Sequence, residues 1–205
     1  MSSSPFLRIS SDLSNVNYEI MSSRNVCLTA HANKAIPDEV HIDLITKCSD
    51  RPGLAGTLIR RLENTLSKPC SLLLQDIATV QCGKISVYLS DIELVKTGHT
   101  FYGRMGFRPI ALGVKADYDD NVETMHGLVL GGVRDGLMAL LPECRDRIRA
   151  AGDHKLVRNL MRELITKSEC QHIVSRLPAL HSLFGTQSLA KAHYVKRLDR
   201  MKGNV

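Results

Sequence analysis

Short apolar or alternating stretches dominate the first two thirds of the chain, and residues that favour turns separate them. Alternation of apolar and polar residues is typical of a β-strand buried on one face, and short uninterrupted apolar runs fit fully buried strands. The pattern predicts strands over residues 17–23, 25–31, 39–48, 70–77, 107–114 and 126–132.

The last third of the chain changes to a helical pattern. Leu, Ile, Val and Met recur there at three- and four-residue intervals with charged residues between them, which predicts amphipathic helices over 134–152, 154–185 and 186–203. Strands and helices followed by helices alone predict an α/β or α+β domain with an all-helical extension. We therefore expect a disordered start at 1–15, a mixed domain at 16–132 and a basic helical extension at 133–205.

The net charge of +6 lies in this helical last third, where Lys and Arg outnumber Asp and Glu. Such helices could form a patch for nucleic acid or for an anionic membrane surface. The sequence disfavours nucleic acid, because the tail has a single Tyr and a single Phe, and because acidic residues interrupt the basic ones. The interpretation that we favour is that the apolar helix faces pack on the sheet, bind a protein partner or mediate oligomerisation.

Targeting and redox signals are absent from the sequence. The first residues have no apolar stretch of signal-peptide length, and no run of eighteen uncharged apolar residues occurs. The six cysteines are scattered singly, so they show neither the paired spacing of a zinc site nor a disulfide framework. We expect no metal, reduced thiols, no membrane span and a cytoplasmic location.

Residues 39–66 combine a predicted strand, a loop of small residues and a predicted helix. Glycines allow a close approach to the backbone, and the first N–H groups of a helix have no partner within the helix, so this order suits a phosphate group. Arg51 adds a positive charge at the same end. The alternative is that the glycines serve only the turn. The loop and first helical residues are Arg51, Pro52, Gly53, Leu54, Ala55 and Gly56.

Together with a second motif, this segment resembles the GNAT superfamily of acetyl-CoA-dependent N-acetyltransferases, over roughly residues 38–131. Gly53-Leu54-Ala55 is similar to the Gly-x-Ala core of the family's pyrophosphate loop. The segment "FYGRMGF" (101–107) is similar to the family's Phe-Tyr-x-x-x-Gly-Phe motif. The resemblance implies a mixed, mostly antiparallel sheet flanked by helices, with shortened opening helices.

Departures from the family pattern affect both motifs. The first loop position is Asp50, with the arginine displaced by one to Arg51. In the second motif Val95 replaces an Asn and Gly98 replaces an Ala, so that helix is expected to be less stable.

The resemblance implies that Tyr102 protonates the departing thiolate of coenzyme A. Phe101 is placed with the cofactor-binding residues, although the rings of this turn could equally belong to the core. Gly106 is expected to close the preceding helix in the left-handed conformation. Backbone amides of the strand end would bind the thioester carbonyl and the pantetheine, and the residues concerned are Leu44, Ile45, Thr46 and Lys47.

Strand alternation places Glu39, His41 and Asp43 on one face of the predicted strand, opposite Val40, Ile42 and Leu44. His41 is the preferred base for removing a proton from the amine, because histidine titrates near neutral pH, and Glu39 could act through water. The alternative is that this face is merely solvated.

The sequence thus predicts an acetyltransferase that moves acetyl from acetyl-CoA directly to a primary amine of a protein or small molecule. The alternative is a GNAT-like binding or scaffold module that acts through the basic tail without catalysis.

Overall fold

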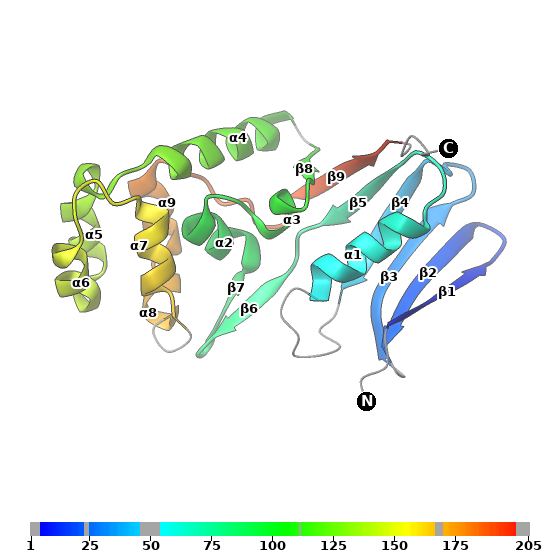
Figure 1. Cartoon of the computed structure of the whole chain (residues 1–205), viewed down its shortest axis with the longest axis horizontal. Coiled ribbons are helices and arrows are strands. Elements are labelled where there is room, and N and C mark those ends of the chain that lie inside the picture. The colour runs from blue at the N-terminus through cyan, green and yellow to red at the C-terminus, as the bar shows by residue number, and fades with distance from the viewer. Residues whose placement is uncertain (1–4, 23–24, 46–53, 111, 167–169, 200–205) are drawn as a thin grey trace, which may run out of the picture. The chain divides into compact units, whose positions relative to one another are not determined.

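A computed structural model describes residues 5–22, 25–45, 54–110, 112–166 and 170–199 (Figure 1). Contacts within the chain divide it into two compact units. The first comprises Met1–Gln75 and His193–Val205, and the second comprises Asp76–Ala192. The first unit therefore combines the two ends of the sequence.

The first unit is built on a mixed, mostly antiparallel sheet. Its strands are β1 (Phe6–Ser11), β2 (Asn15–Ser22), β3 (Asn25–Asn33), β4 (Glu39–Ile45), β5 (Cys70–Gln75) and β9 (His193–Leu198), in the order β1-β2-β3-β4-β5-β9. Neighbouring strands pair antiparallel except β4 and β5, which run parallel and are connected through helix α1 (Leu54–Thr65). Parallel neighbours need such a crossover because the chain must return to the same end of the sheet. The predicted mixture of helices with a mostly antiparallel sheet is confirmed.

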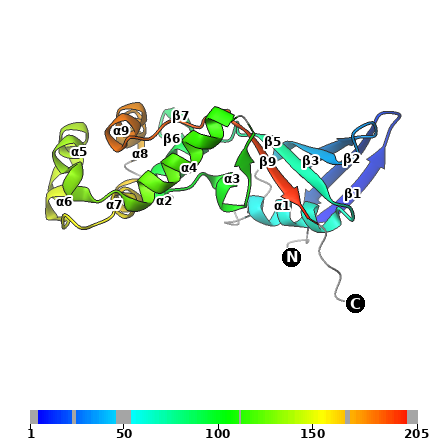
Figure 2. The same ribbon diagram turned by 90° about the horizontal axis from the view of Figure 1, so that it is seen from above.

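Alternation along the strands gives this sheet one apolar and one polar face. On β3, Leu28, Ala30 and Ala32 are buried, whereas Thr29 and His31 between them are only partly buried. Helix α1 lies across the apolar face (Figure 2). The α1 side chains that are fully buried are Leu58, Ile59 and Leu62. Within the described part of this unit, α1 is the one helix, and it covers a single face.

Two segments of the first unit differ from the predicted organisation. Phe6–Ser11 falls in the start that was expected to be disordered, yet it forms β1 and pairs along β2. His193–Leu198 falls in the expected helical extension, yet it forms β9 and pairs along β5. Both predictions are wrong for these residues. Each segment is too short for its own pattern of apolar residues to determine its conformation, and hydrogen bonding to the edge of a neighbouring strand makes it a β-strand.

The second unit consists of a β-hairpin and a series of helices. Its strands are β6 (Thr79–Cys82), β7 (Ile85–Tyr88) and β8 (Arg108–Pro109). Its helices are α2 (Leu89–Thr97), α3 (Phe101–Arg104), α4 (Leu112–Gly127), η1 (Leu130–Gly132), α5 (Arg134–Leu140), η2 (Pro142–Cys144), α6 (Arg145–Ala150), α7 (Val157–Leu164), α8 (Cys170–Val174) and α9 (Leu177–Phe184). The strands predicted over 107–114 and 126–132 are therefore wrong apart from β8, since short apolar runs suit a buried helix equally well.

One apolar core unites the helices of the second unit. Leu94 of α2, Met125 of α4, Leu137 of α5, Met161 of α7 and Leu180 of α9 are all fully buried in it. Each helix contributes one apolar side, as the three- and four-residue spacing predicts. The helices expected between 134 and 185 are confirmed, although they are shorter and more numerous than the two segments predicted there, 134–152 and 154–185.

The cysteines follow the predicted redox state only in part. Cys70, Cys82 and Cys144 are free thiols, whereas Cys27 is disulfide-bonded, which contradicts the expectation for that residue. Spacing along a chain does not determine which sulfur atoms meet in space. In the part of the chain that the structure describes, no helix is both long and apolar enough to cross a membrane.

Candidate functional site

Ionisable side chains of β3 and β4 cluster on the polar face of the first unit. The rings of His31 and His41 stack with their centroids 5.3 Å apart. His31 Nδ1 lies 2.9 Å from Asp43 Oδ2, and His41 Nε2 lies 3.7 Å from Glu39 Oε2. All four side chains remain about one third to one half exposed. This group, Glu39, His41, Asp43 and His31, is called the histidine cluster below. Its imidazole rings can accept a proton, and its carboxylates hold the rings in a fixed orientation.

His31 is the member of the histidine cluster that the sequence does not single out. It lies directly opposite His41 in the antiparallel register of β3 and β4. Side chains opposite each other on neighbouring strands share a face and lie about 5 Å apart. The sequence alone therefore does not identify His31, because its position beside His41 depends on the register of the two strands.

A bulge at Asp43 interrupts the alternation of β4. Ala30 pairs with Ile42, but the next residue of β3, Thr29, pairs with Leu44, so Asp43 is the extra residue. One inserted residue shifts the following side chains to the opposite face. The prediction that Leu44 shares the face of Val40 and Ile42 is therefore wrong: Leu44 is 47% exposed, whereas Ile42 is buried.

The parallel ladder between β4 and β5 covers only the first three residues of β4. Glu39 pairs with Ser71 and His41 pairs with Leu73, while β4 continues to Ile45. The backbone of β4 from Ile42 to Ile45 consequently lies outside the ladder with β5. The ladder ends at His41, and the bulge follows two residues later. Among the described residues, this part of β4 therefore has β3 as its only paired strand.

The loop expected to hold a phosphate is only partly described. Thr46, Lys47, Arg51, Pro52 and Gly53 lie outside the described residues. Leu54, Ala55 and Gly56 form the first turn of α1 and are partly buried. This helix follows the end of β4, which is the order of elements that the sequence predicts.

The aromatic turn belongs to the second unit and forms α3. Thr100 caps the helix, since its hydroxyl oxygen accepts from the backbone N–H of Gly103 at 3.0 Å. Gly106 has φ of 86°, which confirms the predicted left-handed conformation. Phe107 is fully buried, and the Phe101 and Tyr102 rings meet edge to face with centroids 5.1 Å apart. The three rings therefore anchor the turn.

Tyr102 is 7% exposed, and this burial is the main cause that raises the pKa of its phenol. The carboxyl group of Asp76 adds to the increase, because a nearby negative charge disfavours the phenolate. Tyr102 therefore stays protonated at neutral pH and is a weaker acid than an exposed tyrosine. Phe101 shares its helix, whereas His41 and Glu39 belong to the first unit.

Asp76 is a functional candidate that the sequence reasoning missed. It is fully buried at the start of the second unit, and burial raises the pKa of its carboxyl to about 6. Its Oδ1 accepts a hydrogen bond from the N–H of Ala78 at 3.3 Å, and both this bond and the nearby hydroxyl of Ser90 partly offset the increase. The sequence feature that could have identified Asp76 is the presence of an acidic residue near the end of the apolar run 70–77.

A metal centre has no candidate in the described part of the chain, where no group of three or more His, Cys, Asp or Glu side chains is placed to hold an ion. Comparisons with known proteins add nothing to the geometry. No family model matches the chain, and neither a curated protein nor a solved structure is significantly similar to it.

Proposed function

We propose that the chain is an acetyl-CoA-dependent N-acetyltransferase that acts on a primary amine. The observation that carries the proposal is the geometry of β4. Its ladder with β5 ends at His41, a bulge follows at Asp43, and the strand continues to Ile45 without a further β5 partner among the described residues. A substrate with amide groups, such as the pantetheine arm of acetyl-CoA, can hydrogen-bond to an unpaired strand edge as a further strand would.

The loop after β4 and the first turn of α1 are proposed to hold the pyrophosphate of acetyl-CoA. Residues 51–53 would bring Arg51 and Gly53 to the beginning of a helix. A helix N-terminus attracts an anion through its free N–H groups and its dipole. Leu54, Ala55 and Gly56 form that first turn, and the backbone of Leu44 and Ile45 would contact the pantetheine and the thioester carbonyl.

The histidine cluster supplies the base in this proposal. The amine nitrogen attacks the carbonyl carbon of the thioester, and its proton passes to His41, either directly or through water bound to Glu39. The C–S bond then breaks as the amide forms. Backbone N–H groups of β4 beyond the bulge would stabilise the oxyanion of the intermediate. Asp43 holds His31, which stacks on His41 and fixes the orientation of its ring.

The leaving thiolate takes up a proton, which gives free coenzyme A; in the family that the sequence resembles, the tyrosine at the position of Tyr102 donates this proton. Burial keeps this phenol protonated but also makes it a weaker acid, so the assignment rests on the resemblance and not on the pKa. The acceptor is a primary amine of a protein or of a small molecule. Atoms and charges balance without a metal or a covalent enzyme intermediate.

Calorimetric titration with acetyl-CoA tests the binding step. We expect saturable micromolar binding, lost in an Arg51→Glu/Gly53→Glu double variant, because this change places two negative charges beside the pyrophosphate. The matched control is Lys84→Glu, which reverses an exposed charge in the second unit. Absence of binding to the folded wild-type chain would overturn the proposal.

Mass spectrometry of acetylated products tests the chemical step with spermidine and a lysine-containing peptide as acceptors. Removing a general acid or base typically lowers kcat by about 10²-fold or more, which we expect for Tyr102→Phe and for His41→Gln. His154→Gln changes an exposed histidine and should leave kcat unchanged. Full activity of the Tyr102→Phe variant would exclude the phenol as the acid.

The burial of Tyr102 also favours a second candidate function. Its 7% exposure is equally typical of a core residue, so the fold could serve as a binding module without catalysis. Such a module would bind acetyl-CoA weakly or not at all and would yield no acetylated product with either acceptor.

A further inference from the structure

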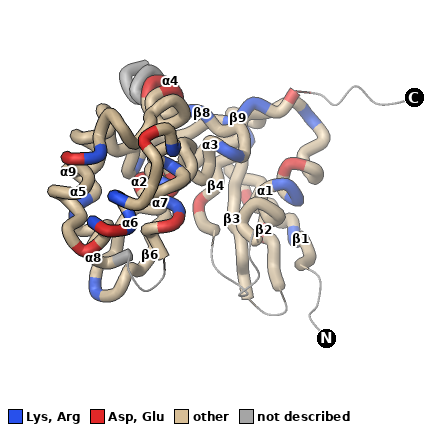
Figure 3. The backbone as a smooth tube through the Cα atoms, turned by 60° about the vertical axis from the view of Figure 1, so that its left-hand side comes forward, with Lys and Arg blue, Asp and Glu red and all other residues tan. Residues whose placement is uncertain are grey.

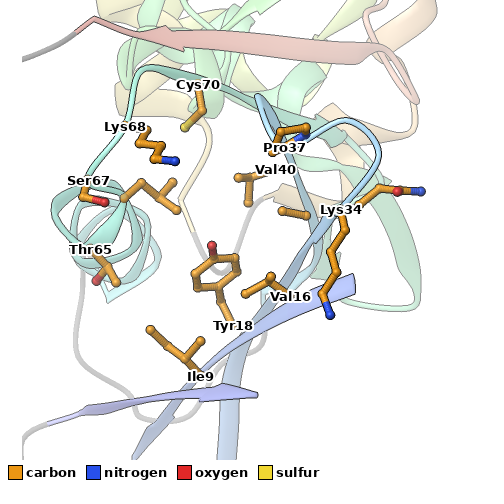
Figure 4. A pocket seen from close by; sticks show the side chains of 13 residues that line it. Ile9, Val16, Tyr18, Lys34, Pro37, Val40, Thr65, Ser67, Lys68 and Cys70 are labelled. Atoms are coloured by element: carbon orange, nitrogen blue, oxygen red, sulfur yellow. The ribbon is translucent and has the colours of Figure 1, made fainter. Parts of the chain in front are cut away.

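A cavity of about 410 Å³ lies at the end of α1 within the first unit (Figure 4). Strands β1 to β4 form one side of the cavity, and the connection between α1 and β5 forms the other. Cavities of roughly 300–1,000 Å³ are the usual size of small-molecule sites. The proposed transferase reaction uses none of the residues that line it.

The walls of this cavity are mainly apolar. Val16, Ala32 and Val40 face it from the sheet, and Leu66 faces it from the segment after α1. These sheet residues belong to the apolar face that α1 covers, but α1 ends at Thr65. The apolar face therefore extends past the end of its helix, and the cavity occupies that place.

Three polar groups converge on the centre of the cavity. Figure 4 shows the Lys68 amine, the Cys70 thiol and the Tyr18 hydroxyl pointing inward from different sides. Other polar groups of the lining have partners elsewhere: the Lys34 amine donates to the carbonyl oxygen of Asp12, the Thr65 hydroxyl donates to that of Arg61, and Asn33 Oδ1 accepts from the N–H of Ala35. The lining residues include two lysines and no carboxylate. The two lysines make the lining positive, and the carboxylate of Asp38, which helps to raise the pKa of Cys70, opposes this charge beside the thiol.

Protonation makes the two neutral groups of this trio hydrogen-bond donors. Burial raises the pKa of Tyr18 and also that of Cys70, so both keep their protons at neutral pH. An ammonium group, a hydroxyl and a thiol that surround one point offer hydrogen bonds to an anionic oxygen. A charged acceptor forms stronger hydrogen bonds than a neutral one does.

We propose that this cavity binds a small monocarboxylic acid with an aliphatic body. The carboxylate accepts hydrogen bonds from Lys68 and from the hydroxyl of Tyr18. The hydrocarbon lies against Val16 and Val40, where its apolar surface is removed from water. An apolar wall with one cationic end matches this class of ligand and disfavours both sugars and polyanions.

The carboxylate site is distinct from the histidine cluster. Val40 points into the cavity, whereas its neighbours Glu39 and His41 lie on the opposite face of β4, because successive side chains of a strand alternate. The proposal therefore stands whether or not the chain transfers acetyl groups.

Calorimetric titration of the full chain with butanoate, octanoate and dodecanoate tests the proposal, with 1-octanol as the uncharged match to octanoate. We expect saturable binding of at least one acid and weaker binding of octanol. Loss of a hydrogen bond to a charged group reduces affinity by about tenfold or more, which we expect for Lys68→Glu with the acids and not with octanol. Lys84→Glu is the control for the change in net charge.

A second pair of variants tests the position of the ligand. Val16→Trp fills the apolar wall and should abolish acid binding, whereas Leu13→Trp alters a residue that is 99% exposed and lies outside the cavity. Circular dichroism verifies that each variant is folded.

Alkylation of Cys70 by iodoacetamide gives an independent measurement. A bound acid should slow the reaction of this lining thiol, while the buried Cys82 and Cys144 serve as internal references. The proposal is overturned if no acid binds, if octanol binds as tightly as octanoate, or if saturating acid leaves alkylation of Cys70 unchanged.

Discussion

Asp76 carries a buried charge that makes the stability of the fold depend on pH. Burial raises the pKa of this carboxyl to about 6, against about 3.9 in an unfolded chain. The folded state therefore binds the proton more tightly than the unfolded state does. The free energy of unfolding falls as the pH rises from about 4 to about 6 and is level with respect to this group at higher pH.

The substitution Asp76→Asn should remove this dependence. Asn keeps an oxygen to accept the hydrogen bond from Ala78 but carries no charge, so the free energy of unfolding at pH 7 should increase, by up to about 3 kcal/mol. Urea unfolding at pH 4.5 and at pH 7 measures the effect. Asp135→Asn, at an exposed position of α5, is the control and should change neither value. A variant less stable than the wild type at pH 7 would contradict the prediction.

Some residues of the candidate site can be identified from the sequence. Others can be identified only when the register of β3 and β4 is known. Glu39 and His41 follow from alternation, and the structure places them side by side on one face. The role of His31 depends on the pairing of β3 with β4, and the position of Leu44 depends on the bulge. Pairing of distant segments is not encoded in the spacing of either one.

At the scale of elements, Gly98 separates two helices where the family resemblance predicts one weakened helix. It ends α2 with φ of 75°, and its N–H donates to the carbonyl of Leu94 at 2.8 Å. Thr100 then begins α3. A residue without a Cβ is required, because an added Cβ would lie 2.5 Å from Cδ2 of His126.

Gly98→Ala should therefore destabilise the protein. The left-handed conformation costs an L-residue about 1–2 kcal/mol, and the His126 ring must also move. Thermal unfolding by calorimetry measures the loss as a lower Tm. Gly127→Ala is the matched control, because a Cβ at Gly127 meets no atom within 4 Å and its φ is not positive. Equal Tm values for the two variants would contradict this explanation.

At the scale of the whole molecule, several basic residues of the last third form ion pairs within the second unit. Arg134 and Lys155 each lie 2.6 Å from a carboxylate oxygen, of Asp153 and Glu163 respectively. Figure 3 shows basic and acidic positions interleaved along these helices. Paired charges leave less positive potential for a polyanion, in agreement with the interleaving visible in the sequence.

We expect that duplex DNA and single-stranded RNA bind weakly at most and without sequence preference. Fluorescence anisotropy with labelled oligonucleotides at 50 and 200 mM salt measures this. A protein that uses a basic patch loses about 10³-fold or more in affinity over this range when it makes six or more phosphate contacts. Tight binding with such a steep salt dependence would show that the ion pairs open for nucleic acid.

The sequence by itself determined the local features of this protein. Periodicity located the β3, β4 and β5 strands and the helices between 134 and 185. Gly106 was identified because a left-handed residue at the end of a helix is usually glycine. These features depend on neighbours along the chain. The tertiary structure alone decided that β1 and β9 join the sheet, that the β4–β5 ladder ends at His41, that His31 meets Asp43, and that a cavity lies past α1. Each of these depends on hydrogen bonds and burial between segments far apart in sequence, whose energies no local pattern contains.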